Sequence, residues 1–121
     1  MHPLERVRLR LLDLHRVLLD LEREEYERRH GPVTPTGYLT ALTTDPMLAW
    51  LKPLTTAIVT LDEILDARGG VKEEDCRESL RYVRDLLTPA EDGTEFQRRY
   101  ADALQQWPAA VLSHAAVLQA L

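Results

Sequence analysis

The side chains best suited to chemistry in this sequence are histidines and carboxylates on helical faces. His15 lies between Leu11 and Leu18, on the apolar side of one helical pattern. Asp62 flanks a second apolar pattern, beside Ile58. If these two helices pack antiparallel, His15 and Asp62 face each other near mid-length and form a polar site for a ligand or a metal ion. The structural alternative is a histidine that is hydrogen-bonded in the core or at its rim, since polar core groups usually have such partners.

A second possible site is the Glu-x-x-His step formed by Glu27 and His30. This spacing places a carboxylate and an imidazole on one helix face, as in di-iron bundles. Such bundles use two of these steps and two further carboxylates, and this sequence contains one step only. No two of the four histidines are separated by three or four residues. Glu27 and His30 are therefore a weak alternative for a metal site, and we expect neither a metal nor a cofactor.

Aromatic residues provide the remaining ligand-binding candidates. Tyr26 and Trp50 are large amphipathic side chains of the kind that line pockets and interfaces. Trp50 lies between the Asp45-Pro46 pair and Pro53, so two prolines restrict its local geometry. In a small helical domain such residues more often belong to the core or its edge. Tyr26 and Trp50 join His15 and Asp62 as candidates for ligand binding.

No pattern in the sequence combines a nucleophile with a base. Cys76 is the only cysteine and occupies an apolar helical position, which is typical of a small packed side chain. Ser79 and Ser113 lack the strand and turn of a nucleophile elbow. Gly69-Gly70 resembles a helix stop rather than a phosphate-binding loop. A catalytic function is therefore less favoured than a non-catalytic one.

A long helix over residues 3–30 must position these side chains. Its apolar residues recur at alternating steps of three and four, which puts them on one stripe. They are Leu4, Val7, Leu11, Leu14, Leu18 and Leu21. His30-Gly31-Pro32 ends the pattern. Such a stripe requires partners, so the sequence predicts an all-α packed domain.

Proline and glycine divide the rest of the chain. Thr34-Pro35, Asp45-Pro46 and Thr88-Pro89 each resemble an N-cap followed by a first-turn proline. Pro53 predicts a kink or a break near residues 51–52. A further helix is expected to begin near Lys72, and another after the turn at residues 92–93. Whether Pro108 kinks one helix or starts another is left open. We expect an irregular bundle of five to six helices, mostly antiparallel neighbours, with a long N-terminal helix.

Composition limits the class of protein. The 121 residues fit a single domain, 1–121, and the net charge of −5 includes no basic segment that would favour nucleic acid. Charged residues between Glu5 and Arg10 leave no room for a signal peptide. No stretch approaches the roughly 20 apolar residues that span a bilayer. With one cysteine, a reducing compartment is the natural location. We expect a cytoplasmic protein with neither membrane nor nucleic acid as its partner.

The function that fits these features is a small, non-catalytic protein–protein interaction or regulatory module. A ligand- or metal-binding bundle that uses His15 with Asp62, or Glu27 with His30, is the alternative. Because the later segments are shorter than the first helix and broken, we expect poor covering either of one end of its stripe or of the C-terminal face with Val111, Leu112, Leu118 and Leu121. A second copy is the commonest way to cover such a patch, so a homodimer is expected. The competing possibility is that only the charged second half of the first helix projects into water.

Overall fold

The computed structural model describes residues 2–121, and its longest element is α1 (Pro3–His30). Local sequence determines both ends of this helix. The His2 Nδ1 atom accepts a hydrogen bond from the backbone N–H of Leu4 at 3.0 Å. Gly31 follows the last turn with a φ of +84°, which glycine adopts without the steric penalty of a Cβ atom. The predicted helix over residues 3–30 is confirmed.

Six shorter helices follow α1 within the described residues, which contain no strand. They are α2 (Pro35–Thr44), α3 (Pro46–Ala49), α4 (Lys52–Leu65), α5 (Glu73–Leu86), α6 (Glu95–Gln106) and α7 (Pro108–Ala120). The all-α fold class is confirmed. The number of helices exceeds the expected five to six because α3 is a separate single turn before the break at residues 50–51, and because Pro108 starts a new helix.

The predicted caps at Thr34 and Asp45 are present. The Thr34 hydroxyl accepts a hydrogen bond from the N–H of Gly37 at 3.0 Å, and the Asp45 carboxylate accepts one from Met47 at 2.9 Å. The predicted cap at Thr88-Pro89 is wrong. The Thr88 hydroxyl instead donates to the carbonyl of Arg84 at 2.8 Å, so it closes α5 rather than opening a helix.

Helix α6 begins at a different threonine, Thr94. Its hydroxyl accepts from the N–H of Gln97 at 3.1 Å, while the Gln97 side chain accepts from the N–H of Thr94 at 3.0 Å. This reciprocal capping box satisfies two backbone donors that a helix start leaves without partners. Gln97 also donates to the carbonyl of Asp85 at 2.8 Å, which ties the start of α6 to α5.

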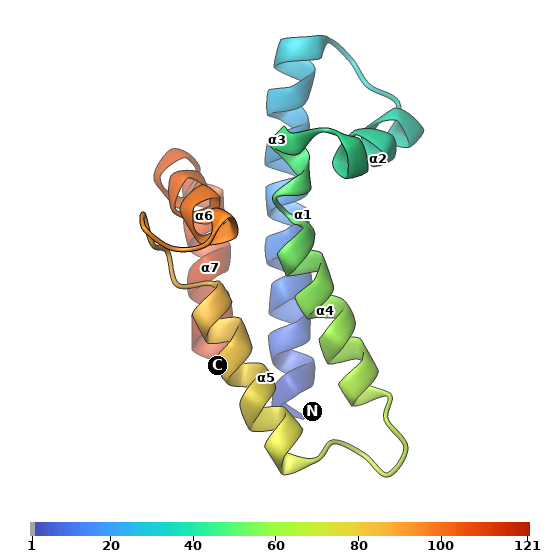
Figure 1. Cartoon of the computed structure of the whole chain (residues 1–121), viewed down its shortest axis with the longest axis vertical. Helices are drawn as coiled ribbons and strands as arrows, with labels where there is room; N and C mark the ends of the chain where they lie inside the picture. Colours follow the sequence, from blue (N-terminus) through green and yellow to red (C-terminus); the bar gives the residue numbers. More distant parts are fainter. Residues whose placement is uncertain (1) are drawn as a thin grey trace.

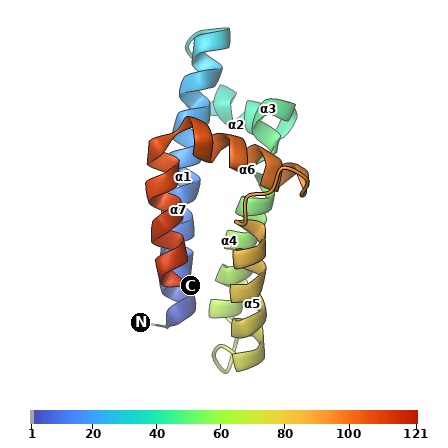
Figure 2. The same ribbon diagram turned by 90° about the vertical axis from the view of Figure 1, so that its left-hand side faces the viewer.

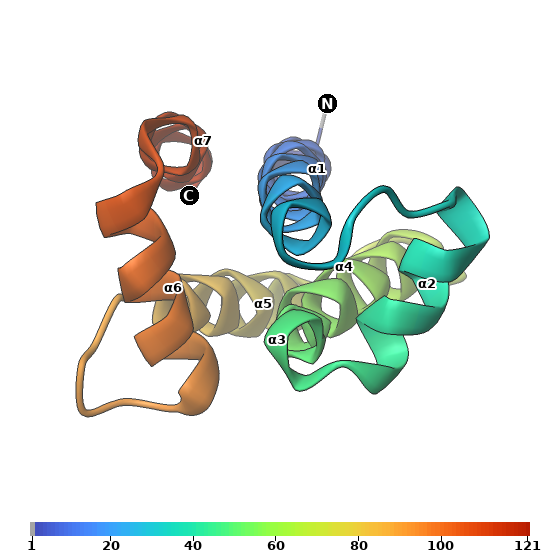
Figure 3. The same ribbon diagram turned by 90° about the horizontal axis from the view of Figure 1, so that it is seen from above.

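Four helices run side by side along the length of the molecule (Figure 1). Helices α4 and α7 run antiparallel to α1, and α5 runs antiparallel to α4 (Figure 2). Helix α6 lies across one end and connects α5 to α7, while α2 lies on the opposite side of α1 from α7 (Figure 3). The expected antiparallel neighbours are therefore present.

The main core fills the space between these four helices. Helix α1 contributes Leu11, Leu14 and Leu18, all with no exposed surface. The facing residues are Leu54, Ile58 and Leu61 from α4, Val83 from α5, Leu87 just after it, Phe96, Tyr100 and Ala103 from α6, and Ala110 and Val117 from α7. The predicted stripes of α1 and α4 thus form one continuous apolar interior.

A second, smaller cluster supports the charged half of α1. Tyr38, Ala41 and Leu48 pack there beside Tyr26. The Tyr38 hydroxyl donates to the carbonyl of Leu19 at 2.6 Å, which fastens α2 to α1. Burial is the main reason that the pKa of Tyr38 rises to about 12. The charged half of α1 is therefore anchored on one side rather than projecting freely into water.

One predicted core position on α1 is corrected. The stripe was expected to continue from Leu18 to Leu21, but Leu21 is half-buried and Glu22 takes the buried position. Residues three and four positions after Leu18 lie on nearly the same helix face, so the packing of α6 decides between them. A carboxylate thus stands at the end of an otherwise apolar stripe.

Candidate functional site

Helix α7 is the element with the most unusual surface. Its thirteen residues include no charged side chain, and its apolar residues surround the helix instead of forming one stripe. A helix that is apolar on all sides normally lies in an interior. Here only one side of α7 is covered by the rest of the chain.

The inner side of α7 is firmly attached to the bundle. Ala110 and Val117 are fully buried. The Tyr100 hydroxyl and the His114 Nδ1 atom lie 2.6 Å apart. Burial raises the pKa of Tyr100 and lowers the pKa of His114, which favours the neutral form of both groups, and the imidazole tautomer sets which of the two donates the hydrogen bond.

The outer side of α7 exposes large apolar side chains. Leu112 is 75% exposed, Leu118 is 47% exposed and Val111 is 44% exposed. Ala115 is also exposed and lies on the same side of the helix. Val111, Leu112, Ala115 and Leu118 together are called the α7 face below. Of the two surfaces expected to be poorly covered, the C-terminal one is exposed at Val111, Leu112 and Leu118, whereas Leu121 is half-buried and packs against the core.

The structure does not bring His15 and Asp62 together. The His15 Nε2 atom lies 2.9 Å from the Thr55 hydroxyl, and the Asp62 carboxylate lies 3.2 Å from the guanidinium of Arg8. Burial lowers the pKa of His15, which favours the neutral ring. The antiparallel packing was correctly expected, but its register places Asp62 about two helical turns, roughly 10 Å, beyond Thr55. The proposed ligand site between His15 and Asp62 is therefore corrected to two separate polar contacts.

Tyr26 and Trp50, the aromatic candidates, lie in different surroundings. The ring of Tyr26 lies 4.5 Å from that of His30 and 6.4 Å from that of Tyr38, at the edge of the smaller cluster. Trp50 is buried, and its ring lies 5.5 Å from that of Phe96. Trp50 also lines a polar pocket between α1 and α6, whereas Tyr26 does not.

Glu27 and His30, the weak alternative for a metal site, do not form such a site in the structure. Glu27 is paired with Arg23, with 2.9 Å between carboxylate and guanidinium, and the ring of His30 packs against that of Tyr26 at a tilt of 40°. Among residues 2–121, no group of three or more histidine, cysteine or carboxylate side chains is arranged to hold a metal ion.

We predict that the purified protein contains no stoichiometric transition metal. The physical reason is that Glu27 already has a cationic partner and that His30 has no second imidazole or carboxylate set beside it. Elemental analysis of protein prepared without chelators tests this prediction. About one zinc, iron or manganese ion per chain, lost in a His30→Ala variant, would contradict it.

No protein family, curated protein or solved structure matches this chain. Within residues 2–121, no helix has both the length and the apolar character needed to cross a bilayer.

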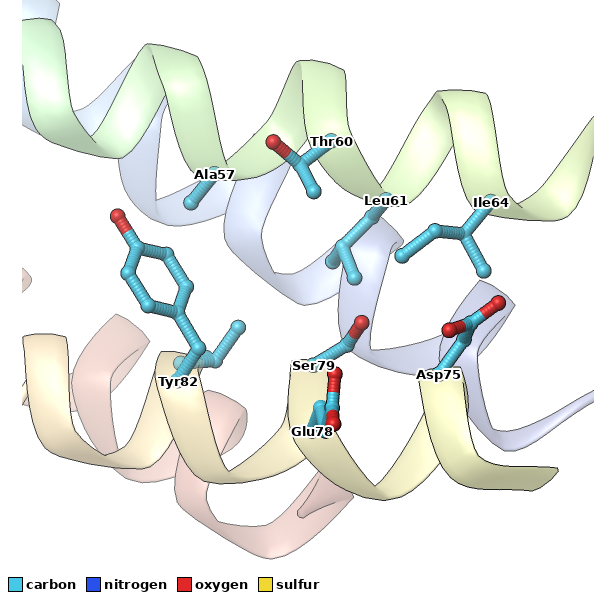
Figure 4. Close-up of a pocket in the computed structure, with 9 residues that line it drawn as sticks. Ala57, Thr60, Leu61, Ile64, Asp75, Glu78, Ser79 and Tyr82 are labelled. Atoms are coloured by element: carbon cyan, nitrogen blue, oxygen red, sulfur yellow. The ribbon is translucent and has the colours of Figure 1, made fainter. Parts of the chain in front are cut away.

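A shallow pocket of about 210 Å³ between α4 and α5 offers a further surface (Figure 4). Ala57, Leu61 and Ile64 form its apolar wall on α4, and Asp75 and Glu78 lie along α5. The lining includes Ser79 but no histidine, lysine or arginine. The pocket therefore lacks the histidine that usually activates a serine hydroxyl, and neither Asp75 nor Glu78 is hydrogen-bonded to Ser79, so the serine–base pair of nucleophilic catalysis is not assembled there.

Proposed function

We propose that this chain is a non-catalytic protein–protein interaction module that associates with a second copy of itself through the α7 face. The observation that supports this proposal is that α7 has no charged residue and turns Val111, Leu112 and Leu118 toward solvent. Contiguous exposed apolar surface on a soluble domain usually marks an interaction site.

The surface area of the chain is consistent with a missing partner. Its accessible surface is 7597 Å² for a mass of 13.9 kDa. A compact monomer of that mass exposes about 6,700 Å². The excess is about 900 Å², close to the roughly 800 Å² that each partner buries in an interface of standard size. The excess belongs to the whole chain, and an interface of standard size with one further copy would bury a comparable area.

The composition of the α7 face favours a second copy over other partners. A face without charges meets its own copy without like-charge repulsion, although the whole chain carries a net charge of −5. The small side chain of Ala115 allows two helices to approach closely across a two-fold axis. A membrane surface is less suitable because α7 offers no lysine or arginine for anionic lipids.

We predict that Leu112→Glu abolishes self-association. The exposed position leaves the fold intact, whereas a dimer would have to bury two carboxylates without partners, which weakens association by more than about 100-fold. The matched control is Leu39→Glu, because Leu39 is 65% exposed on α2, on the other side of α1 from α7. Sedimentation equilibrium at micromolar concentrations measures the mass of each variant.

The expected result is a dimer mass for the unmodified chain and for Leu39→Glu, and the mass of one chain for Leu112→Glu. A monomer mass for the unmodified chain throughout a dilution series would overturn self-association and leave the α7 face for a different protein. A dimer that persists unchanged in Leu112→Glu would show that copies meet through another surface, and would equally refute the proposal.

A further inference from the structure

A small polar pocket lies where the second half of α1 meets α6. Its volume is about 180 Å³, and its lining includes Glu22 and Arg29 from α1, Trp50, Arg99 from α6, and Trp107. This volume equals that of about six water molecules. It is smaller than the roughly 300–1,000 Å³ of sites for drug-sized ligands, so any ligand must be small.

Glu22 is the reason to regard this pocket as a binding site. Its side chain is only 9% exposed, at the end of the leucine stripe of α1. None of the ion pairs in the described part of the chain involves Glu22. Arg99 and Arg29 lie near enough to favour the ionised form of Glu22 but form no ion pair with it, and Trp50 is its hydrogen-bonding neighbour. A buried carboxylate without a direct ion pair is costly, and a ligand that supplied a cation at contact distance would remove much of that cost.

The other lining groups define the chemistry of that ligand. Desolvation raises the pKa of Glu22 to about 6, and Arg99 and Arg29 oppose this rise, so the carboxyl group is mostly ionised at neutral pH. Trp50 and Trp107 add indole surfaces, which attract ammonium groups. The lining also includes the carboxylates of Glu25 and Asp102, so the pocket presents groups of both signs. The two arginines suit a ligand that has a carboxylate in addition to its ammonium group.

Therefore we propose that this pocket binds a small free α-amino acid, with its ammonium group on Glu22 and its carboxylate on Arg99. Both charges of the ligand then meet opposite charges of the protein, and the indoles cover its short side chain. This site is independent of the α7 face, so either proposal can fail without the other.

The two tryptophans of the chain make this proposal directly measurable. Trp50 and Trp107 are the only tryptophans in the sequence, and both line the pocket. Intrinsic tryptophan fluorescence therefore responds to this pocket, although Trp50 also lines a second pocket beside Thr44 and Glu95. The probe is L-alanine at millimolar concentrations, with propionate, which lacks the ammonium group, and ethylamine, which lacks the carboxylate, as matched probes.

We expect L-alanine to change the fluorescence saturably, and propionate and ethylamine to bind at least about 10-fold more weakly, since each loses one charged hydrogen-bonding group. Glu22→Gln and Arg99→Gln are each expected to weaken L-alanine binding by about 10-fold or more. Glu24→Gln is the matched control, because Glu24 is exposed on the same helix and does not line the pocket. Circular dichroism verifies that each variant keeps its helix content.

Several results would overturn the proposal. One is the absence of a saturable response to L-alanine. Another is equal affinity for ethylamine and L-alanine, which would show that the arginines do not hold a carboxylate. A third is unchanged L-alanine binding in a folded Glu22→Gln variant, which would place the response elsewhere.

Discussion

Replacement of Leu14 or Leu18 by alanine is expected to lower the free energy of unfolding by about 2–5 kcal/mol in each case. Both side chains have no exposed surface and lie at the centre of the α1 stripe, where α4, α5 and α7 converge. Truncation removes buried methyl and methylene groups and leaves a cavity that neighbouring side chains fill only in part. A loss of this size is a large fraction of the roughly 5–15 kcal/mol that stabilises a typical domain.

Chemical denaturation followed by circular dichroism measures this loss. Leu9→Ala is the matched control, because Leu9 lies on the same helix but is 42% exposed. We expect its effect to stay within about 0.5 kcal/mol, as for surface substitutions in general. If Leu14→Ala and Leu18→Ala were as mild as Leu9→Ala, the stripe of α1 would not be the core of this domain.

The second large effect concerns Glu22. The Glu22→Gln variant is expected to be more stable than the unmodified chain at pH 7. The difference in the free energy of unfolding between the two proteins is expected to be about 1–2 kcal/mol larger at pH 7 than at pH 4. Burial raises the folded-state pKa of Glu22 from 4.5 to about 6. The charged and titratable groups around it are Glu25 and Arg29 on α1, and Arg99 and Asp102 on α6. Glutamine keeps the shape of the side chain and removes its charge.

The sign follows from the two pKa values. Below about pH 4.5, Glu22 is protonated in both the folded and the unfolded chain, and its stabilising contribution is fully present. As the pH rises through about 6, the folded chain must ionise a buried carboxyl group, and this contribution is lost. A glutamine at this position does not titrate, so the difference between the two proteins grows over this pH range.

Denaturation of both proteins at pH 4 and at pH 7 tests this expectation. Glu24→Gln is again the control, because it removes the same charge from an exposed position of α1. A stability difference for Glu22→Gln that is the same at both pH values, or no larger than that of Glu24→Gln, would show that Glu22 is hydrated in the folded chain. In that case the proposed counter-ion role of Glu22 in the pocket would also lose its physical basis.

The elements of this fold were predicted best where their signals are local. The start of α1 at Pro3, the stop at Gly31, and the caps at Thr34 and Asp45 depend on a few neighbouring residues. The break at residues 50–51, between α3 and α4, was likewise expected, as a kink or a break, from Pro53. Backbone geometry and hydrogen bonds within one or two turns decide such features, so the sequence contains the necessary information.

Thr88-Pro89 shows the limit of these local rules. The same residue pair that opens α2 at Thr34-Pro35 closes α5 at Thr88, because the Arg84 carbonyl is within reach of the hydroxyl there. A threonine side chain can satisfy either a free N–H or a free carbonyl group. The surrounding chain decides which of the two is present.

The sequence by itself determined that this chain is helical and where most helices in its first half begin and end. It also determined which residues form the apolar stripes of α1 and α4. Only the tertiary structure decided the partners of the polar residues. The register of α1 against α4 gave His15 to Thr55 and Asp62 to Arg8, and the position of α6 placed Glu22 rather than Leu21 in the interior. For α7, the sequence indicated an uncovered C-terminal face, but a helix that is apolar on all sides has no periodic signal, so only packing decided that Ala110 and Val117 face inward. Helical periodicity depends on one segment alone, whereas contacts depend on how two segments slide and rotate against each other.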